Sequence, residues 1–264
     1  MSILDAVIIA IVEGLTEFLP ISSTGHMIIT EKLLGVEAND FTRLFTVGIQ
    51  LGAILAVLVL YWKKFITPIR TGRWNFYLKL IVAVIPALVL GYIFSDRIDA
   101  LLDSALVVSI TMIAGGIILL FIDRFFREES VSTEEQIGFT GALIIGIWQC
   151  IAMIPGVSRS AASIIGGMQQ KLTRKLAAEF SFFLAVPTMA AATGYKLLKG
   201  YKTISPDDIK LYVIGNAVAF VVAILAIRFF IGYLQRHGFR LFGYYRIVAG
   251  SILLALILSG VIRG

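Results

Sequence analysis

Residues 13 to 26, EGLTEFLPISSTGH, gather carboxyl, hydroxyl and imidazole side chains within a strongly apolar chain. Glu13 and Glu17 lie four residues apart, so on a helix they share one face, about one turn apart. Carboxylates inside a membrane are costly and normally line a polar cavity where they act. Two such oxygen donors suit a hard divalent cation, Mg²⁺ or Ca²⁺. Alternatively, one carboxyl group could be protonated or could orient the histidine.

Pro20 is followed by three hydroxyl residues and a histidine, namely Ser22, Ser23, Thr24 and His26. At least one hydroxyl should cap the helix that starts after the proline. The start of such a helix also offers free N–H groups and the positive end of its dipole, which together bind anions. His26 lies three residues from Ser23 and close to two carboxylates. This is the hydroxyl, imidazole and carboxylate set that activates a nucleophile.

A second polar cluster, Ser158, Arg159 and Ser160, also follows a proline, Pro155. Arg159 is the only charged residue in the segment 136–170. A buried arginine beside two hydroxyls suits phosphate, because its planar fork donates to two oxygens at once. The same arginine could instead neutralise the acidic pair of the first cluster. Together the clusters offer what phosphoryl transfer needs, and a site inside the membrane implies a lipid-borne phosphate, either hydrolysed or transported.

The composition is that of a polytopic α-helical membrane protein. Of the 264 residues, 58% are hydrophobic and 15% are charged, with a mean hydropathy of +0.91, whereas soluble domains are about 25% charged. Many of the basic residues behind the net charge of +6 lie in short loops, as the positive-inside rule explains, so nucleic acid is an unlikely partner. Apolar runs long enough to cross a bilayer recur at 44–62, 76–94, 105–122, 211–231 and 243–262.

An internal repeat divides the chain, which we interpret as one membrane domain spanning residues 1–264. The predicted halves are 1–133 and 134–264. When the sequence is shifted by 135 residues, two pairs of segments match without a gap, and the apolar spans between them coincide. The matching pairs are PISSTG (20–25) with PGVSRS (155–160) and AGGIILL (114–120) with AGSILLA (249–255).

Each half then contains one apolar segment broken by proline, 3–34 or 138–170, followed by three unbroken spans. A break at membrane depth is tolerated where protein or a watery cavity satisfies the freed backbone groups, so each broken segment is interpreted as a re-entrant helical hairpin. A hairpin followed by three spans crosses the membrane an odd number of times. The halves should therefore be inverted repeats, whose paired broken helices mark a binding site near the midplane.

Loop charges predict the orientation of the chain. Loop 63–75 carries four basic residues and no acidic one, so it should be cytoplasmic, whereas loop 95–104 carries three aspartates against one arginine and should be external. The basic residues of the second half that should also be cytoplasmic are Lys171, Arg174, Lys175, Arg236 and Arg240. Because inverted hairpins enter from opposite sides, these charges leave open which face the site opens to.

The two polar clusters resemble the motifs of the bacitracin-resistance family of undecaprenyl-diphosphate phosphatases. EGLTEFLPISSTGH resembles the first motif of that family and IPGVSRS the second. The likeness continues through 49–64, 178–187 and 244–250, so it covers essentially the whole chain. The resemblance implies an enzyme of the bacterial inner membrane that hydrolyses undecaprenyl diphosphate to its monophosphate. This recycles the lipid carrier for peptidoglycan and cell-wall synthesis and gives bacitracin resistance.

The resemblance also implies catalytic and metal-binding roles. Glu13 and Glu17 match the acidic pair that is implicated in metal binding and catalysis, with Mg²⁺ or Ca²⁺ as the expected cation. Ser23 matches the proposed nucleophile and His26 its acid/base partner.

A phosphate-binding group follows from the same resemblance. Arg159 matches the phosphate-binding arginine of the second motif. Four hydroxyl residues lie beside it or beside the nucleophile and are expected to assist, namely Ser22, Thr24, Ser158 and Ser160.

Two mechanisms and a second class of function stay open. Ser23 could attack the terminal phosphorus while His26 takes its proton, or metal-bound water could attack with Ser23 only a ligand. Inverted repeats are also a transporter architecture, so the alternative is a polyprenyl-phosphate flippase, against which the serine and histidine pair argues. The family resemblance favours a site on the external side. Expected partners are the polyprenyl diphosphate substrate and membrane lipids, with a homodimer as one option for the assembly.

Overall fold

The computed structural model describes residues 1–37, 39–72, 74–102, 104–200 and 205–262. Arg73 of loop 63–75 and Asp103 of loop 95–104 lie outside these ranges. The described residues form helices and no β-strand beyond an isolated bridge between Val131 and Leu172. In chain order the helices are α1 (Ile3–Thr16), α2 (Ser23–Leu34), α3 (Asp40–Gly48), α4 (Gln50–Leu60), α5 (Trp62–Thr71), α6 (Asn75–Ile93), α7 (Ser95–Leu102), α8 (Ala105–Phe125), η1 (Glu134–Gln136), α9 (Phe139–Cys150), η2 (Ile151–Met153), α10 (Arg159–Gln169), α11 (Arg174–Gly200), α12 (Pro206–His237) and α13 (Arg240–Leu258).

Six helical segments within the described residues are long and apolar enough to cross a membrane. They are Asp40–Leu60, which combines α3 and α4, together with α6, α8, α11, most of α12, and α13. The prediction of a polytopic all-α membrane protein is confirmed. Two segments that were expected to be loops are largely helical, because α5 occupies most of 63–75 and α7 most of 95–104.

The two broken apolar segments each form a pair of short helices. Helix α1 packs on α2 in the first, and α9 packs on α10 in the second, with η2 between them. Neither α1 nor α2 is among the helices long enough to span, and the same holds for α9 and α10. This agrees with the interpretation of both segments as helical hairpins.

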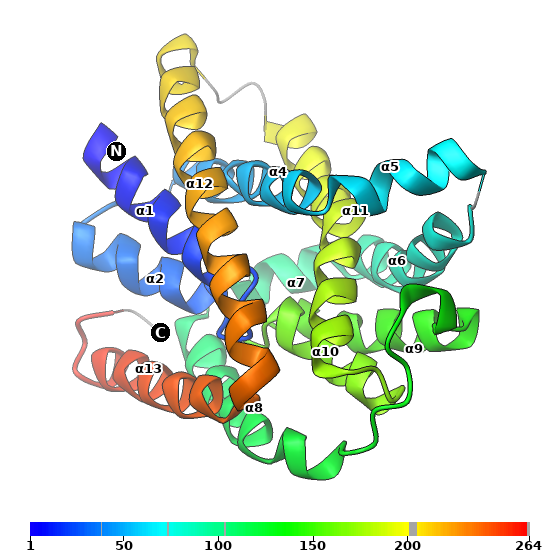
Figure 1. Cartoon of the computed structure of the whole chain (residues 1–264). Helices are drawn as coiled ribbons and strands as arrows, with labels where there is room; N and C mark the ends of the chain where they lie inside the picture. The colour runs from blue at the N-terminus through cyan, green and yellow to red at the C-terminus, as the bar shows by residue number, and fades with distance from the viewer. Residues whose placement is uncertain (38, 73, 103, 201–204, 263–264) are drawn as a thin grey trace.

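Helix packing follows the sequence repeat. Helix α1 lies against α12 as α9 lies against α6, and α4 lies against α12 as α11 lies against α6, while α8 and α13 pack along each other (Figure 1). A shift of 135 residues exchanges the members of these pairs. The packing thus gives the repeat a structural counterpart, and the inversion of the halves across a membrane stays a prediction.

A serine in the left-handed backbone region begins the second helix of each hairpin. Ser22 has φ +71° and Ser158 has φ +73°, a conformation that is uncommon for residues other than glycine and marks local strain. The Oγ of Ser22 accepts a hydrogen bond from Gly25 N at 3.4 Å, and that of Ser158 accepts one from Ala161 N at 3.2 Å. The expected hydroxyl caps are present. Because the caps lie 136 residues apart, the gap-free match at the breaks is wrong by one residue.

Candidate active site

A cavity of about 1090 Å³ is lined by the broken ends of both hairpins together with residues of α3 and α11. Seven of the nine predicted site residues line it, namely Glu13, Glu17, Ser22, Ser23, Thr24, Ser158 and Arg159. The polar clusters that the sequence places far apart therefore share one site. The other two, His26 and Ser160, are not among the lining residues.

Glu17 connects the two clusters. Its Oε2 accepts a hydrogen bond from Ser23 Oγ at 2.7 Å, and its Oε1 lies 3.2 Å from Arg159 Nη2. Both charged side chains are largely buried, with 7% and 13% of their surfaces exposed. The expectation that Arg159 neutralises the acidic pair across the repeat is confirmed. The same carboxylate also holds the serine hydroxyl, so Glu17 is positioned to accept the proton of Ser23.

Arg159 is held on one edge only. Its Nη1 donates to the carbonyl of Ser181 at 3.0 Å, and its guanidinium lies 5.8 Å from the centre of the Phe18 ring. Its Nε is buried and has no hydrogen-bond partner among the described residues. A guanidinium that lines the cavity and retains a free donor fits the predicted recognition of a phosphate.

Glu13 supplies the second carboxylate of the cavity. It is buried, its side chain contacts that of Glu17, and its Oε1 has no hydrogen-bond partner among the described residues. No group of three or more histidine, cysteine or acidic residues gathers in the part of the chain that is described. Mg²⁺ commonly binds to one or two carboxylates plus substrate phosphates and water. The orphaned oxygen of Glu13 and the carboxylate of Glu17 therefore fit such a cation.

Ser160 links the two hairpins instead of facing the cavity. It is fully buried, and its Oγ donates to the carbonyl of Phe18 at 2.8 Å. The hydroxyl is thereby committed to the backbone at the end of the first hairpin helix. This placement argues against the expected phosphate-binding role of Ser160.

His26 does not hydrogen-bond to Ser23. Its Nδ1 lies 2.7 Å from the carbonyl oxygen of Ser22, and its Nε2 lies 2.7 Å from the hydroxyl of Tyr245, whose ring stacks on the imidazole. A carbonyl oxygen only accepts, so Nδ1 donates, and Nε2 of the neutral ring accepts from Tyr245. Both ring nitrogens are thus occupied. The expected serine–histidine pair is replaced by a serine–glutamate pair.

Arg246 is a site residue that sequence reasoning missed. It is completely buried in α13 and uses all five of its N–H donors on backbone carbonyls. The acceptors, at 2.9 to 3.2 Å, are the carbonyls of Pro20, Thr111, Met112, Gly156 and Val157. They include both hairpin breaks, so Arg246 satisfies backbone groups that the breaks leave free. An arginine within the apolar run 243–262 was the available signal.

Replacing Arg246 with methionine is expected to destabilise the fold by about 3–5 kcal/mol, because buried carbonyl groups of both breaks lose their donor. The thermal unfolding midpoint of the purified protein in detergent measures this effect. Arg240→Met, which changes an exposed arginine of the same helix, is the matched control. Equal midpoints for the two variants would show that Arg246 does not support the breaks.

Comparison with known proteins agrees with this site. Residues 6–252 match the family described as "Bacitracin resistance protein BacA". A protein of Flavobacterium psychrophilum named undecaprenyl-diphosphatase is 56% identical over 259 residues, which are 97% of this chain and 96% of the relative. Proteins of the same name from Flavobacterium johnsoniae and Porphyromonas gingivalis are 54% and 51% identical, covering 97% and 99% of this chain and 96% and 99% of the relatives. The chain therefore belongs to the BacA family of bacitracin resistance proteins.

Proposed function

We propose that this protein is a membrane phosphatase that hydrolyses undecaprenyl diphosphate to undecaprenyl phosphate and inorganic phosphate. The observation that carries the proposal is the hydrogen bond from Ser23 to Glu17, with Arg159 on the same carboxylate, inside a cavity large enough for a diphosphate. The names of the relatives supply the identity of the lipid substrate. Such an enzyme recycles the carrier lipid of cell-wall synthesis and thereby supports bacitracin resistance.

The reaction begins with Ser23 as the nucleophile. Its Oγ attacks the terminal phosphorus while Glu17 accepts the hydroxyl proton, and the bond from that phosphorus to the bridging oxygen breaks. Arg159 binds the phosphate oxygens, and the N–H groups that begin α2 face the same charge. Undecaprenyl phosphate leaves, and water then releases phosphate from the serine. In this scheme His26 orients the turn at Ser22, a revision of its expected role as the base.

A divalent cation fits the site as a cofactor, with Glu13 and Glu17 as its protein ligands. When bound, it would neutralise charge on the diphosphate and polarise the bond that breaks. The orphaned Oε1 of Glu13 supports this assignment.

We infer that the cavity opens to the external side of the bacterial inner membrane. Helix α11 has Arg174 in its first turn, whereas Lys196 and Lys199 near its other end line the cavity. Lys171 and Arg174 belong to the basic group expected in the cytoplasm, so the cavity residues at the opposite end of α11 lie toward the outside.

A flippase is the less favoured function for this scaffold. A carrier needs an anion-binding arginine, but it does not need a hydroxyl that is hydrogen-bonded to a carboxylate. The names of the relatives also denote hydrolysis.

The proposal is tested by measuring phosphate release from undecaprenyl diphosphate by the purified protein in detergent, with and without EDTA. We expect release by the wild-type protein, its loss with EDTA, its recovery with added Mg²⁺ or Ca²⁺, and little release by Arg159→Ala. Folded wild-type protein that releases no phosphate in the presence of either cation, but moves undecaprenyl phosphate across a vesicle bilayer, would identify the flippase instead.

Tyr245→Phe is expected to lower the turnover number by about threefold to tenfold, the value of one net hydrogen bond. The substitution removes the hydroxyl on His26 Nε2 and leaves the stacked ring in place. Tyr244→Phe, at the exposed neighbouring position, is the control and should have no effect. Unchanged turnover by Tyr245→Phe would mean that the orientation of His26 does not matter.

A further inference from the structure

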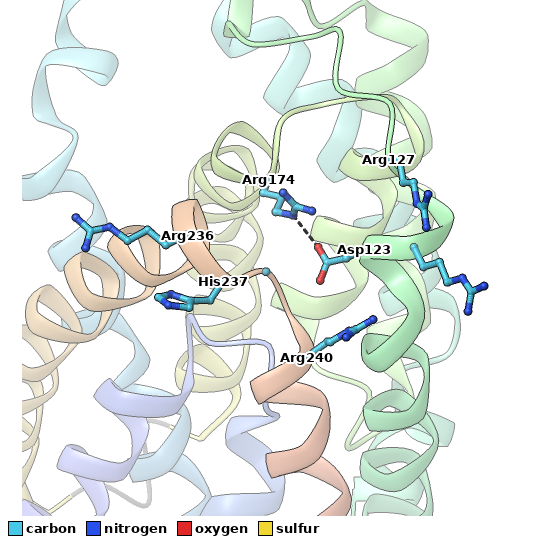
Figure 2. A pocket seen from close by; sticks show the side chains of 8 residues that line it. Asp123, Arg127, Arg174, Arg236, His237 and Arg240 are labelled. Atoms are coloured by element: carbon cyan, nitrogen blue, oxygen red, sulfur yellow. Dashed lines mark hydrogen bonds and ion pairs between the residues drawn. The ribbon is translucent and has the colours of Figure 1, made fainter.

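A second cavity, of about 530 Å³, lies where α8 and α12 end and where α11 and α13 begin. Basic side chains dominate its lining, which consists of Asp123, Arg124, Arg127, Arg174, Arg236, His237, Gly238 and Arg240. Figure 2 shows Arg174 and Arg240 on two sides of Asp123. We call this cavity the basic pocket.

The one carboxylate that lines the basic pocket is already occupied. Asp123 Oδ1 lies 2.7 Å from Arg174 Nε, and Oδ2 accepts a hydrogen bond from Phe239 N at 2.8 Å. Glu129, outside the lining, lies 3.5 Å from Arg174 Nη1. Within the described part of the chain, four lining arginines form no ion pair, namely Arg124, Arg127, Arg236 and Arg240. The basic pocket therefore carries a strong excess of positive charge.

Asp123 also fixes the shape of the basic pocket. Gly238, in the turn between α12 and α13, has φ +68°, and a Cβ there would lie 2.5 Å from Asp123 Oδ2. Only glycine permits this close approach, through which Asp123 binds the start of α13. The turn thereby places Arg236 and Arg240 at one cavity. The positive charge is arranged by buried backbone contacts and is not merely scattered over a surface.

The basic pocket is separate from the catalytic cavity. Arg174 is the first residue of α11, and Lys196 and Lys199, which line the catalytic cavity, lie near its other end. A helix of 27 residues is about 40 Å long, so the sites lie toward opposite ends of the spanning region. The diphosphate chemistry proposed above makes no use of these arginines.

Apolar side chains beside the basic pocket are exposed toward the surroundings. Phe125 at the end of α8 is 75% exposed, and Leu241 and Tyr244 in the first turns of α13 are 50% and 60% exposed. In a spanning protein such positions face acyl chains and the lipid interface. A ligand of the arginines that also carries acyl chains would be matched by this surface.

We propose that the basic pocket binds the phosphate of an anionic phospholipid headgroup. Arginine forks recognise phosphate oxygens in pairs, and basic pockets between helices on the cytoplasmic side bind such headgroups. The same guanidinium groups would also accept free inorganic phosphate, so the two sources must be separated by experiment.

The test uses the full-length protein in neutral detergent and counts bound lipid by native mass spectrometry. Phosphatidylglycerol, phosphatidylcholine and inorganic phosphate are titrated separately at matched ionic strength. The test variant is Arg127→Ala/Arg240→Ala, which leaves the pair of Asp123 and Arg174 intact. The matched control is Lys63→Ala/Arg70→Ala, which removes the same charge from exposed positions of the predicted cytoplasmic segment 63–75.

We expect phosphatidylglycerol to bind the wild-type protein more tightly than phosphatidylcholine, and to bind the Arg127→Ala/Arg240→Ala variant about tenfold or more weakly, the loss from removing charge-assisted hydrogen bonds. The control variant should match the wild type. Equal weakening in both variants would overturn the proposal by showing general charge attraction, and so would no weakening in either. Phosphate binding that depends on Arg127 and Arg240 without any lipid preference would overturn the lipid assignment and identify a soluble anion as the ligand.

Discussion

Replacing Ser23 with alanine is expected to lower the turnover of undecaprenyl diphosphate by about 10⁴-fold or more, because the proposed nucleophile is lost. The substitution removes one hydroxyl, whose recorded partner is Glu17 Oε2, and leaves the cap at Ser22 intact. Steady-state phosphate release by wild type and variant measures the change. Ser251→Ala, at an exposed position of α13, is the control and should retain full activity.

Trapping the intermediate separates the two chemical routes that the sequence leaves open. If Ser23 attacks phosphorus, acid quenching during turnover should leave a phosphorylated serine at position 23, detectable by peptide mass spectrometry. A Ser23→Ala variant that keeps most of its activity, together with unmodified Ser23 in the quenched wild type, would assign the attack to water instead.

The fold was largely predictable because the bilayer imposes simple rules on sequence. Apolar runs of sufficient length mark spans, and proline with hydroxyl residues marks the breaks. The same rules say little about short amphipathic helices, so α5 and α7 were expected as loops. The repeat predicted the pairing of helices but not the extra residue before Ser158, because matching letters cannot detect where the backbone turns into the left-handed region.

The composition of the site was also predictable, whereas its hydrogen bonds were not. Sequence spacing placed His26 near Ser23, but the direction of the imidazole depends on Tyr245, which is 219 residues away along the chain. The buried arginine Arg246 acts through carbonyls of both breaks, and these contacts exist only because α13 packs along α8. Such long-range partners leave no trace in local spacing. The identity of the base that contacts Ser23 therefore had to come from the structure.

Glu17→Gln is expected to lower turnover by about 10³-fold, within the range for loss of a general base. The amide keeps the shape of the side chain but does not take up the serine proton at neutral pH, and it leaves Arg159 without its counter-charge. Glu31→Gln is the matched control, because Glu31 lines the same cavity and no hydrogen bond or ion pair joins it to Ser23 or Arg159 in the described residues.

The comparison with His26→Gln decides which residue is the base. If Glu17 takes the proton and His26 only orients the turn at Ser22, then His26→Gln should cost about tenfold, far less than Glu17→Gln. Both turnover numbers come from the same phosphate-release measurement, with unfolding midpoints to verify folding. The opposite order, with His26→Gln the more damaging change, would mean that the imidazole leaves Tyr245 and contacts Ser23 when substrate binds. The serine–glutamate hydrogen bond would then describe only the substrate-free arrangement of the site.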